Sequence, residues 1–303
     1  MSSNRTVGAL PVLSLLVGAS LWGVIWYPLR ELEHGGLQGV WLTLILYATA
    51  LVFSLPRTAR HLPEFLRSPR DLAILLLAAG WTNVAFVLAI LEGNILRVML
   101  LFYLSPLWAV TLGWLILKER MSRAALVSLL FAMLGALIML WNRDVGFPWP
   151  HSHADWLALS AGFAFALSNV LVRKVQEVSV ACKSAAVWIG VVVVALAMIV
   201  LFDLPLPRAP MTIYAGAMLL GVAGILVMTV LVQFGVSHMP VHRSAVIALV
   251  EIVAGALSQQ LLSNEVVTPL EWGGGALIVL GAYWSARVSV PKGQGEPALP
   301  PLK

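Results

Sequence analysis

The sequence predicts an all-α polytopic membrane protein, with ten transmembrane helices arranged as two inverted five-helix repeats. Composition is the first observation behind this prediction. Of the 303 residues, 60% are hydrophobic and only 11% are charged, whereas about 25% of the residues of an average soluble domain are charged. The other two observations are the spacing of the apolar runs and a repeat of charged positions between the two halves of the chain.

The apolar runs have the length needed to cross a bilayer. A hydrocarbon layer about 30 Å thick takes about 20 helical residues. Short polar or proline-containing connections separate the runs, so each is interpreted as one membrane span. In chain order, the predicted spans cover residues 7–28, 37–55, 71–91, 97–117, 124–141, 155–173, 185–202, 211–236, 243–262 and 270–287.

Basic residues gather in alternate connections, which tests the number of spans independently. Cytoplasmic loops of membrane proteins collect Lys and Arg. With the amino end placed inside, 15 of the 19 Lys and Arg residues fall on the cytoplasmic side. The pattern therefore predicts a multi-pass protein of a bacterial-type inner (plasma) membrane with both termini in the cytoplasm. The outer side then holds only Arg30, Arg97, Arg143 and Arg208.

The two halves of the chain repeat each other. A shift of 146 residues aligns two whole spans without a gap, and a shift of 143 aligns the first span with the sixth. Five spans per copy is an odd number, so the second copy enters the membrane from the opposite side, which makes the repeat inverted. The aligned pairs are Arg97 with Arg243, Ser105 with Glu251, Glu119 with Glu265, Arg30 with Arg173, and Trp22 with Phe165.

This repeat divides the chain into three parts. Residues 1–146 form the first five-helix copy and residues 147–289 the second, and the polar, Pro/Gly-rich tail 290–303 is predicted to be a disordered cytoplasmic segment. In transporters, inverted repeats place a substrate site at the membrane midplane and support alternating access.

Two stretches carry a resemblance to a known family. Residues 103–119 lead into Leu134-Gly135-Ala136, and residues 248–265 lead into Leu280-Gly281-Ala282. They resemble the EamA type of the drug/metabolite transporter superfamily. The resemblance implies ten helices with cytoplasmic termini, a central cavity lined mainly by helices 1, 3, 4, 6, 8 and 9, and export of amino acids or other small metabolites.

The sequence departs from that family at one position. The family often has proline after the glutamate of the ninth helix, whereas Ile252 follows Glu251 here. Pro106 keeps the proline of the first copy only, so kinking is expected to be asymmetric. Pro106 and Pro28 are the predicted kink positions.

Glu251 is the only acidic residue placed away from the ends of a span. It follows Arg243 by eight residues, or about 12 Å of helix, and therefore lies near the middle of the bilayer, where an ionisable side chain usually marks a functional site. Ser258 falls on the same helix face, with Gln259 beside it. Close helix packing around a hydrogen-bonded neutral glutamate is the alternative interpretation. We favour a cavity wall whose acid binds a substrate amine or couples transport to protons.

The remaining candidates are neutral polar or aromatic. An interhelical hydrogen bond is the alternative role for each polar one, and an interfacial belt is the alternative for the tryptophans. An aromatic cavity with one acid would accept a hydrophobic or aromatic amine through apolar contact and cation–π attraction. Besides Glu251, Ser258 and Gln259, the predicted substrate-binding or coupling residues are Trp22, Asn83, Tyr103, Ser105, Asn169 and Gln233.

Several other classes of function find no support. The net charge of +5 is spread along the chain and indicates no nucleic-acid partner, and the single cysteine, Cys182, has no metal-ligand spacing around it, so neither a metal nor a cofactor is expected. No nucleotide-binding motif is present, and no Lys or Arg is expected within a span to bind a phosphate substrate. Secondary active transport of a small solute is the prediction. An intramembrane enzyme, which should show paired acids, His clusters or a nucleophile at membrane depth, and a non-transporting scaffold remain as alternatives. No oligomeric state is indicated.

Overall fold

The computed structural model describes residues 9–37, 39–141, 149–263 and 266–287, and throughout these ranges the chain forms helices and their connections. In the described ranges, nine helical stretches have the length and hydropathy to cross a membrane. A further helix of 19 residues, α14, completes the set of ten. The predicted all-α polytopic fold is confirmed, while Arg143, Glu265 and the tail 290–303 lie outside the described residues.

The helices begin and end within a few residues of the predicted spans. Four spans are divided into shorter segments, and η1 (Ala59–Leu66) joins the second span to the third. In chain order, the spans are α1 (Ala9–Val24) with α2 (Trp26–His34), α3 (Gly39–Thr58), α4 (Pro69–Glu92), α5 (Ile95–Phe102) with α6 (Ser105–Leu117), α7 (Arg123–Leu140), α8 (His153–Lys174), α9 (Val180–Leu201), α10 (Met211–Leu220) with the π-helical η2 (Gly221–Leu226) and α11 (Val227–Ser237), α12 (Val241–Ala248) with α13 (Val250–Leu262), and α14 (Pro269–Arg287).

Two of the interruptions lie at the predicted kink prolines. Proline has no N–H to donate to the carbonyl four residues earlier. Pro28 accordingly follows the break between α1 and α2 at Ile25, and Pro106 follows the break between α5 and α6.

The ninth span breaks as well, at Leu249, although no proline lies in it. Both copies are therefore interrupted at this span, although only the first has a proline after the break. A hydrogen bond to the carbonyl three residues earlier follows each break: Leu107 N–H donates to Leu104 O (3.0 Å), and Ile252 N–H donates to Leu249 O (3.1 Å). The shift of 146 residues superposes these two breaks within one residue, so the interruption belongs to the repeated unit.

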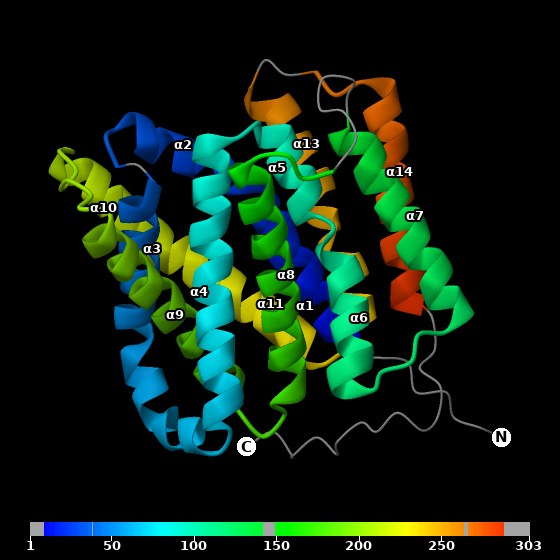
Figure 1. Cartoon of the computed structure of the whole chain (residues 1–303), viewed down its shortest axis with the longest axis horizontal. Coiled ribbons are helices and arrows are strands. Elements are labelled where there is room, and N and C mark those ends of the chain that lie inside the picture. Colours follow the sequence, from blue (N-terminus) through cyan, green and yellow to red (C-terminus); the bar gives the residue numbers. More distant parts are fainter. Residues whose placement is uncertain (1–8, 38, 142–148, 264–265, 288–303) are drawn as a thin grey trace.

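Helix packing repeats between the two copies. α4 packs on α8 as α11 packs on α1, and α6 packs on α8 as α13 packs on α1. α7 and α14 lie side by side along one edge of the bundle (Figure 1). Glycines, which have no side chain, allow this close approach. A methyl group added at Gly135 would lie 2.4 Å from Gly274 O, and one added at Gly281 would lie 2.7 Å from Ser128 O. The shift of 146 residues aligns Gly135 with Gly281 and Ser128 with Gly274, so each contact is the counterpart of the other, as expected for a pseudo-twofold arrangement.

Candidate functional site

The carboxyl group of Glu251 lies directly after the break of the ninth span. It is half-buried and faces the phenol of Tyr103, which is placed to form a hydrogen bond with it. Tyr103 itself lies at the break of the fourth span, between α5 and α6. Tyr103 and Leu249 belong to the same packed cluster, so the two broken helices meet at their interruptions, with one acid and one phenol at the junction.

An aromatic row extends from this junction towards α4 and α8. The ring centroids of Tyr103 and Phe102 are 5.4 Å apart, and Phe102 also contacts Phe165 (5.5 Å) and Phe86 (4.8 Å). Tilted and edge-on pairs at these separations are favourable for aromatic rings. Trp22 lies elsewhere, packed against the cluster that contains Tyr47 and Trp188.

Ser258 lies in the contact between α1 and α13. Its hydroxyl accepts a hydrogen bond from Trp26 Nε1 (2.8 Å) and donates to Gly255 O (2.8 Å). A methyl group added at Gly23 would lie 2.4 Å from Glu251 O, so the two helices touch through small residues. This part of the predicted polar face makes packing contacts in the present conformation.

The other predicted residues occupy different surroundings. Asn83 accepts a hydrogen bond from the Tyr47 hydroxyl (2.9 Å) and donates to Ala79 O (3.0 Å), so it links α4 to α3. Gln233 is only 7% exposed, and its Oε1 has no hydrogen-bond partner among the described residues. An unpaired buried acceptor is costly, which makes this oxygen available to a ligand donor. Ser105 is buried beside Pro106, and Asn169 and Gln259 are half-buried.

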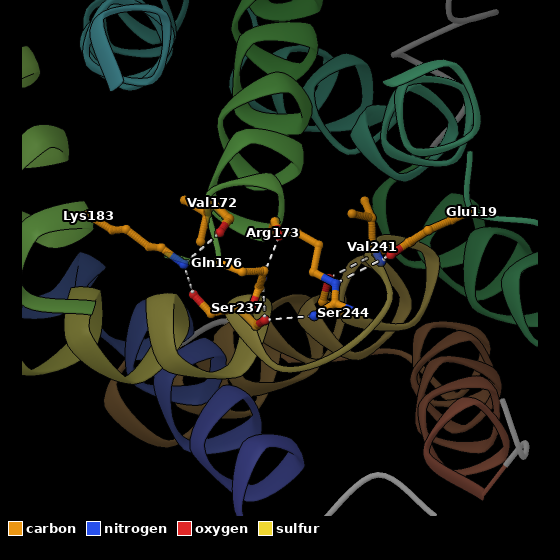
Figure 2. Close-up of polar contacts among 8 residues, drawn as sticks. All are labelled: Glu119, Val172, Arg173, Gln176, Lys183, Ser237, Val241 and Ser244. Carbon is orange, nitrogen blue, oxygen red and sulfur yellow. Dashed lines mark hydrogen bonds and ion pairs between the residues drawn. The ribbon is translucent and has the colours of Figure 1, made fainter. Parts of the chain in front are cut away.

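A second group of polar side chains, absent from the predictions, lies at the end of the bundle where Arg173, Lys174 and Glu119 gather. Figure 2 shows it around Ser237, the last residue of α11. Ser237 O accepts from the Arg173 guanidinium (2.9 Å) and from Gln176 Nε2 (3.0 Å), and Ser237 Oγ accepts from Lys183 Nζ (3.0 Å). We call the residues Glu119, Arg173, Gln176, Lys183 and Ser237 the Ser237 cluster.

Glu119 connects the Ser237 cluster to two further spans. Its Oε1 lies 3.3 Å from Arg173 Nε, and its Oε2 accepts from Val241 N (2.8 Å) at the start of α12. The first N–H groups of a helix have no partner within the helix, and the positive end of the helix dipole favours an anion there. A carboxylate from the end of the fourth span therefore holds the beginning of the ninth.

Lys183 corrects the expectation that no Lys or Arg lies within a span. The predicted seventh span began at residue 185, but α9 begins at Val180 because the Ser179 hydroxyl caps it. Lys183 is 2% exposed and belongs to the membrane-spanning part of the chain. The serine, three residues before Cys182, is the signal that could have located this helix start in the sequence.

A carboxylate outside the spans fixes the same helix start. Glu64 Oε2 accepts from Ser179 N (2.7 Å), and Oε1 pairs with His61 Nδ1 (2.7 Å). Partial burial raises the pKa of Glu64, but the hydrogen bonds from Ser179 and the pairing with His61 outweigh it and hold this pKa below its usual value. Glu64 is therefore a charged anchor of α9.

The opposite end of the bundle contains ion pairs of its own. Arg97 Nε pairs with Asp155 (2.8 Å), and His153 pairs with Glu92 (2.7 Å). Asp155, His153 and Glu92, whose side chains are of the kinds that bind metals, each have a partner in these pairs. No group of three or more His, Cys, Asp or Glu suited to a metal ion occurs among the described residues.

Comparison with known proteins adds the family context. The EamA-like transporter family matches residues 9–141 and again residues 152–287. Protein RarD of Salmonella typhi is 26% identical over 176 residues, covering 54% of this chain and 55% of RarD. Protein RarD of Streptomyces exfoliatus is 25% identical over 239 residues, covering 74% of this chain and 69% of that protein. The chain thus spans about half the length of the first of these relatives.

A solved crystal structure, described only as that of a protein, has the same fold. It superposes with a TM-score of 0.74 at 16% sequence identity, and the match covers 91% of this chain and 96% of the other. At this identity the likeness concerns the fold alone.

Proposed function

The chain belongs to the EamA-like transporter family, and we propose that it is a secondary active transporter that exports amino acids or other small metabolites by alternating access. The observation that carries the proposal is the position of Glu251. A single carboxyl lies where two interrupted helices from opposite copies of the repeat meet, beside Tyr103. Interrupted helices at a repeat interface are the usual location of substrate and coupling-ion sites in such transporters.

The chemistry of the junction favours a substrate that carries an amine. Glu251 supplies a carboxyl group at the junction that can attract a cation. Gln233, on α11 and apart from the junction contacts, offers a buried amide oxygen without a partner among the described residues. The aromatic row of Phe102, Phe165 and Phe86 offers an apolar surface next to Tyr103. A solute with an ammonium group and a hydrophobic or aromatic body matches this combination.

The same geometry supports the proposal that Glu251 couples transport to protons. A carboxyl group away from bulk water exchanges its proton readily for a cationic substrate, because the two compete for the same negative charge. The Tyr103 phenol is placed to hydrogen-bond the carboxyl in either state. Trp22, Asn83, Ser105, Asn169, Ser258 and Gln259 complete the proposed set of substrate-contacting residues, and Pro106 and Pro28 are the proposed points of helix bending.

The orientation of the protein is also part of the proposal. The distribution of basic residues supports an orientation with both termini in the cytoplasm of a bacterial-type inner membrane. On this orientation the Ser237 cluster lies at the cytoplasmic end of the bundle, and the Arg97–Asp155 pair lies at the outer end.

Reconstitution into liposomes with and without a pH gradient tests this function. Amino acids and aromatic amines form the substrate panel. We expect the pH gradient to stimulate flux of at least one amine-bearing solute, and Glu251→Gln to abolish this stimulation because glutamine cannot release a proton. Glu92→Gln is the matched control, since Glu92 is exposed at the end of α4. Wild-type flux and pH dependence in Glu251→Gln would refute the coupling role, and absence of flux with every solute would favour a scaffold.

A further inference from the structure

The Ser237 cluster joins five of the ten spans at one end of the molecule. Glu119 follows the fourth span, Arg173 ends the sixth, Lys183 opens the seventh, Ser237 ends the eighth, and Val241 N opens the ninth. The fourth span belongs to the first copy of the repeat and the others to the second. Any movement that separates the two copies at this end must therefore break the Glu119 contacts.

Lys183 donates to a carbonyl group that α8 leaves without a helical partner. Val172 O would accept from Gln176 N in a continued α8, but that N–H donates to Lys174 O (3.0 Å) instead. Lys183 Nζ takes its place, at 2.9 Å from Val172 O. Cations at helix C-termini interact favourably with the last carbonyls and with the helix dipole. Lys183 and Arg173 thereby tie the C-terminal ends of α8 and α11 together.

Both hydrogen-bond partners of Lys183 are neutral oxygens. A buried ammonium held only by neutral groups gives less stability than one that faces a carboxylate, because its desolvation is not offset by an opposite charge. Water can therefore replace both partners of Lys183 without separating an ion pair.

Arg30 provides the comparison at the other end. The repeat aligns Arg30 with Arg173. Arg173 has a side chain only 14% exposed and pairs with Glu119, whereas Arg30 is exposed and lies 6.0 Å from the centre of the Trp26 ring. Equivalent arginines are thus in different states at the two ends, as expected when an inverted repeat adopts one of two alternating conformations.

We propose that the Ser237 cluster is the gate that closes the cytoplasmic end of the transport path, with the bonds of Glu119 to Arg173 and to Val241 N as its closing contacts. The proposal rests on the transport function proposed above and specifies how one end of that path is controlled. Opening separates Glu119 from Arg173 and from Val241 N, and exposes the buried start of α9 to water.

Cys182 makes the gate measurable in the native chain. It is the only cysteine in the sequence, it is buried, and it precedes Lys183 in the first turn of α9. The rate at which a membrane-impermeant maleimide labels it reports exposure of this end. Labelling rates are compared in inside-out vesicles for the wild-type chain and for the variants Glu119→Gln and Arg173→Gln. Ser128→Ala is the control, because Ser128 is buried outside the Ser237 cluster and its hydroxyl donates to Ala125 O of its own helix.

We expect Glu119→Gln and Arg173→Gln to increase the labelling rate at least about tenfold, which corresponds to about 1.4 kcal/mol in the closing equilibrium. The melting temperature should stay close to that of the wild type, and Ser128→Ala should change neither quantity. Unchanged labelling in both single variants overturns the gate. Faster labelling that accompanies a matching loss of thermal stability also overturns it, since the cluster would then only maintain the fold.

This readout is independent of any substrate. If Glu251→Gln leaves pH-driven flux intact while Glu119→Gln accelerates labelling, the coupling role of Glu251 fails and the gate stands. If Glu251→Gln abolishes coupling while Glu119→Gln and Arg173→Gln leave labelling unchanged, the gate fails and the coupling role of Glu251 stands.

Discussion

The fourth and ninth spans are the same element of the repeat built with different residues. The fourth contains Pro106 and Ser105 directly after its break, whereas the ninth has Ile252 and Glu251 at the aligned positions. Both spans nevertheless break within one residue of the same point. Packing between the copies therefore maintains the interruption where proline is absent, and the ninth span can carry the acid without carrying the proline.

Introducing proline into the ninth span tests this comparison most strongly. In Ile252→Pro the helix loses only the bond from Ile252 N to Leu249 O, at a place where it is already interrupted. Ile278→Pro alters an uninterrupted part of α14, and both isoleucines are buried in the same cluster. Because an interior proline costs about 3 kcal/mol or more, we expect Ile278→Pro to be less stable than Ile252→Pro by about that amount.

Thermal unfolding of the purified variants in detergent measures this difference. Losses of equal size would contradict an interruption that is already present in the folded ninth span.

Two glycines that face the broken helices give the next largest effect. A methyl group at Gly162 of α8 would lie 2.6 Å from Phe102 O, and one at Gly23 of α1 would lie 2.4 Å from Glu251 O. Backbone atoms cannot give way cheaply, so we expect Gly162→Ala and Gly23→Ala each to cost about 1–3 kcal/mol in the free energy of unfolding. Similar losses would indicate that the two copies support their breaks alike.

Gly273→Ala is the control for these substitutions. A methyl group there meets no atom within 4 Å, and alanine is favoured over glycine in a helix by about 1 kcal/mol. A neutral or stabilising result at Gly273, measured in the same unfolding assay, separates close packing from the general effect of removing a glycine.

Ser105→Ala should have the smallest effect of these variants. Ser105 is the counterpart of Glu251, but one neutral hydrogen bond contributes only about 0.5–1.5 kcal/mol. We expect flux in liposomes to fall at most about fivefold while its stimulation by a pH gradient persists. A loss of stimulation as complete as that expected for Glu251→Gln would mean that both copies contribute to coupling, and that the site is not asymmetric.

Hydropathy and charge were sufficient to predict the ten spans, because each helix in a bilayer must satisfy its own backbone hydrogen bonds and cover itself with apolar side chains. These are local requirements. The error at the seventh span shows their limit. Lys183 looked like the end of a loop, and a cap by Ser179, anchored by Glu64, moved it one turn into the bundle. A shift of this size changes a cation from solvated to buried.

The sequence by itself determined the class of protein, the number of helices, the repeat and the position of Glu251 along its span, because composition and spacing carry that information. Only the tertiary structure decided that Glu251 faces Tyr103, that the ninth span breaks without a proline, and that Lys183, Arg173 and Glu119 converge on Ser237. The physical reason is that these contacts join residues from different spans. Their partners are chosen by how helices pack, through close approaches such as those at Gly23 and Gly162, and no local pattern encodes that choice.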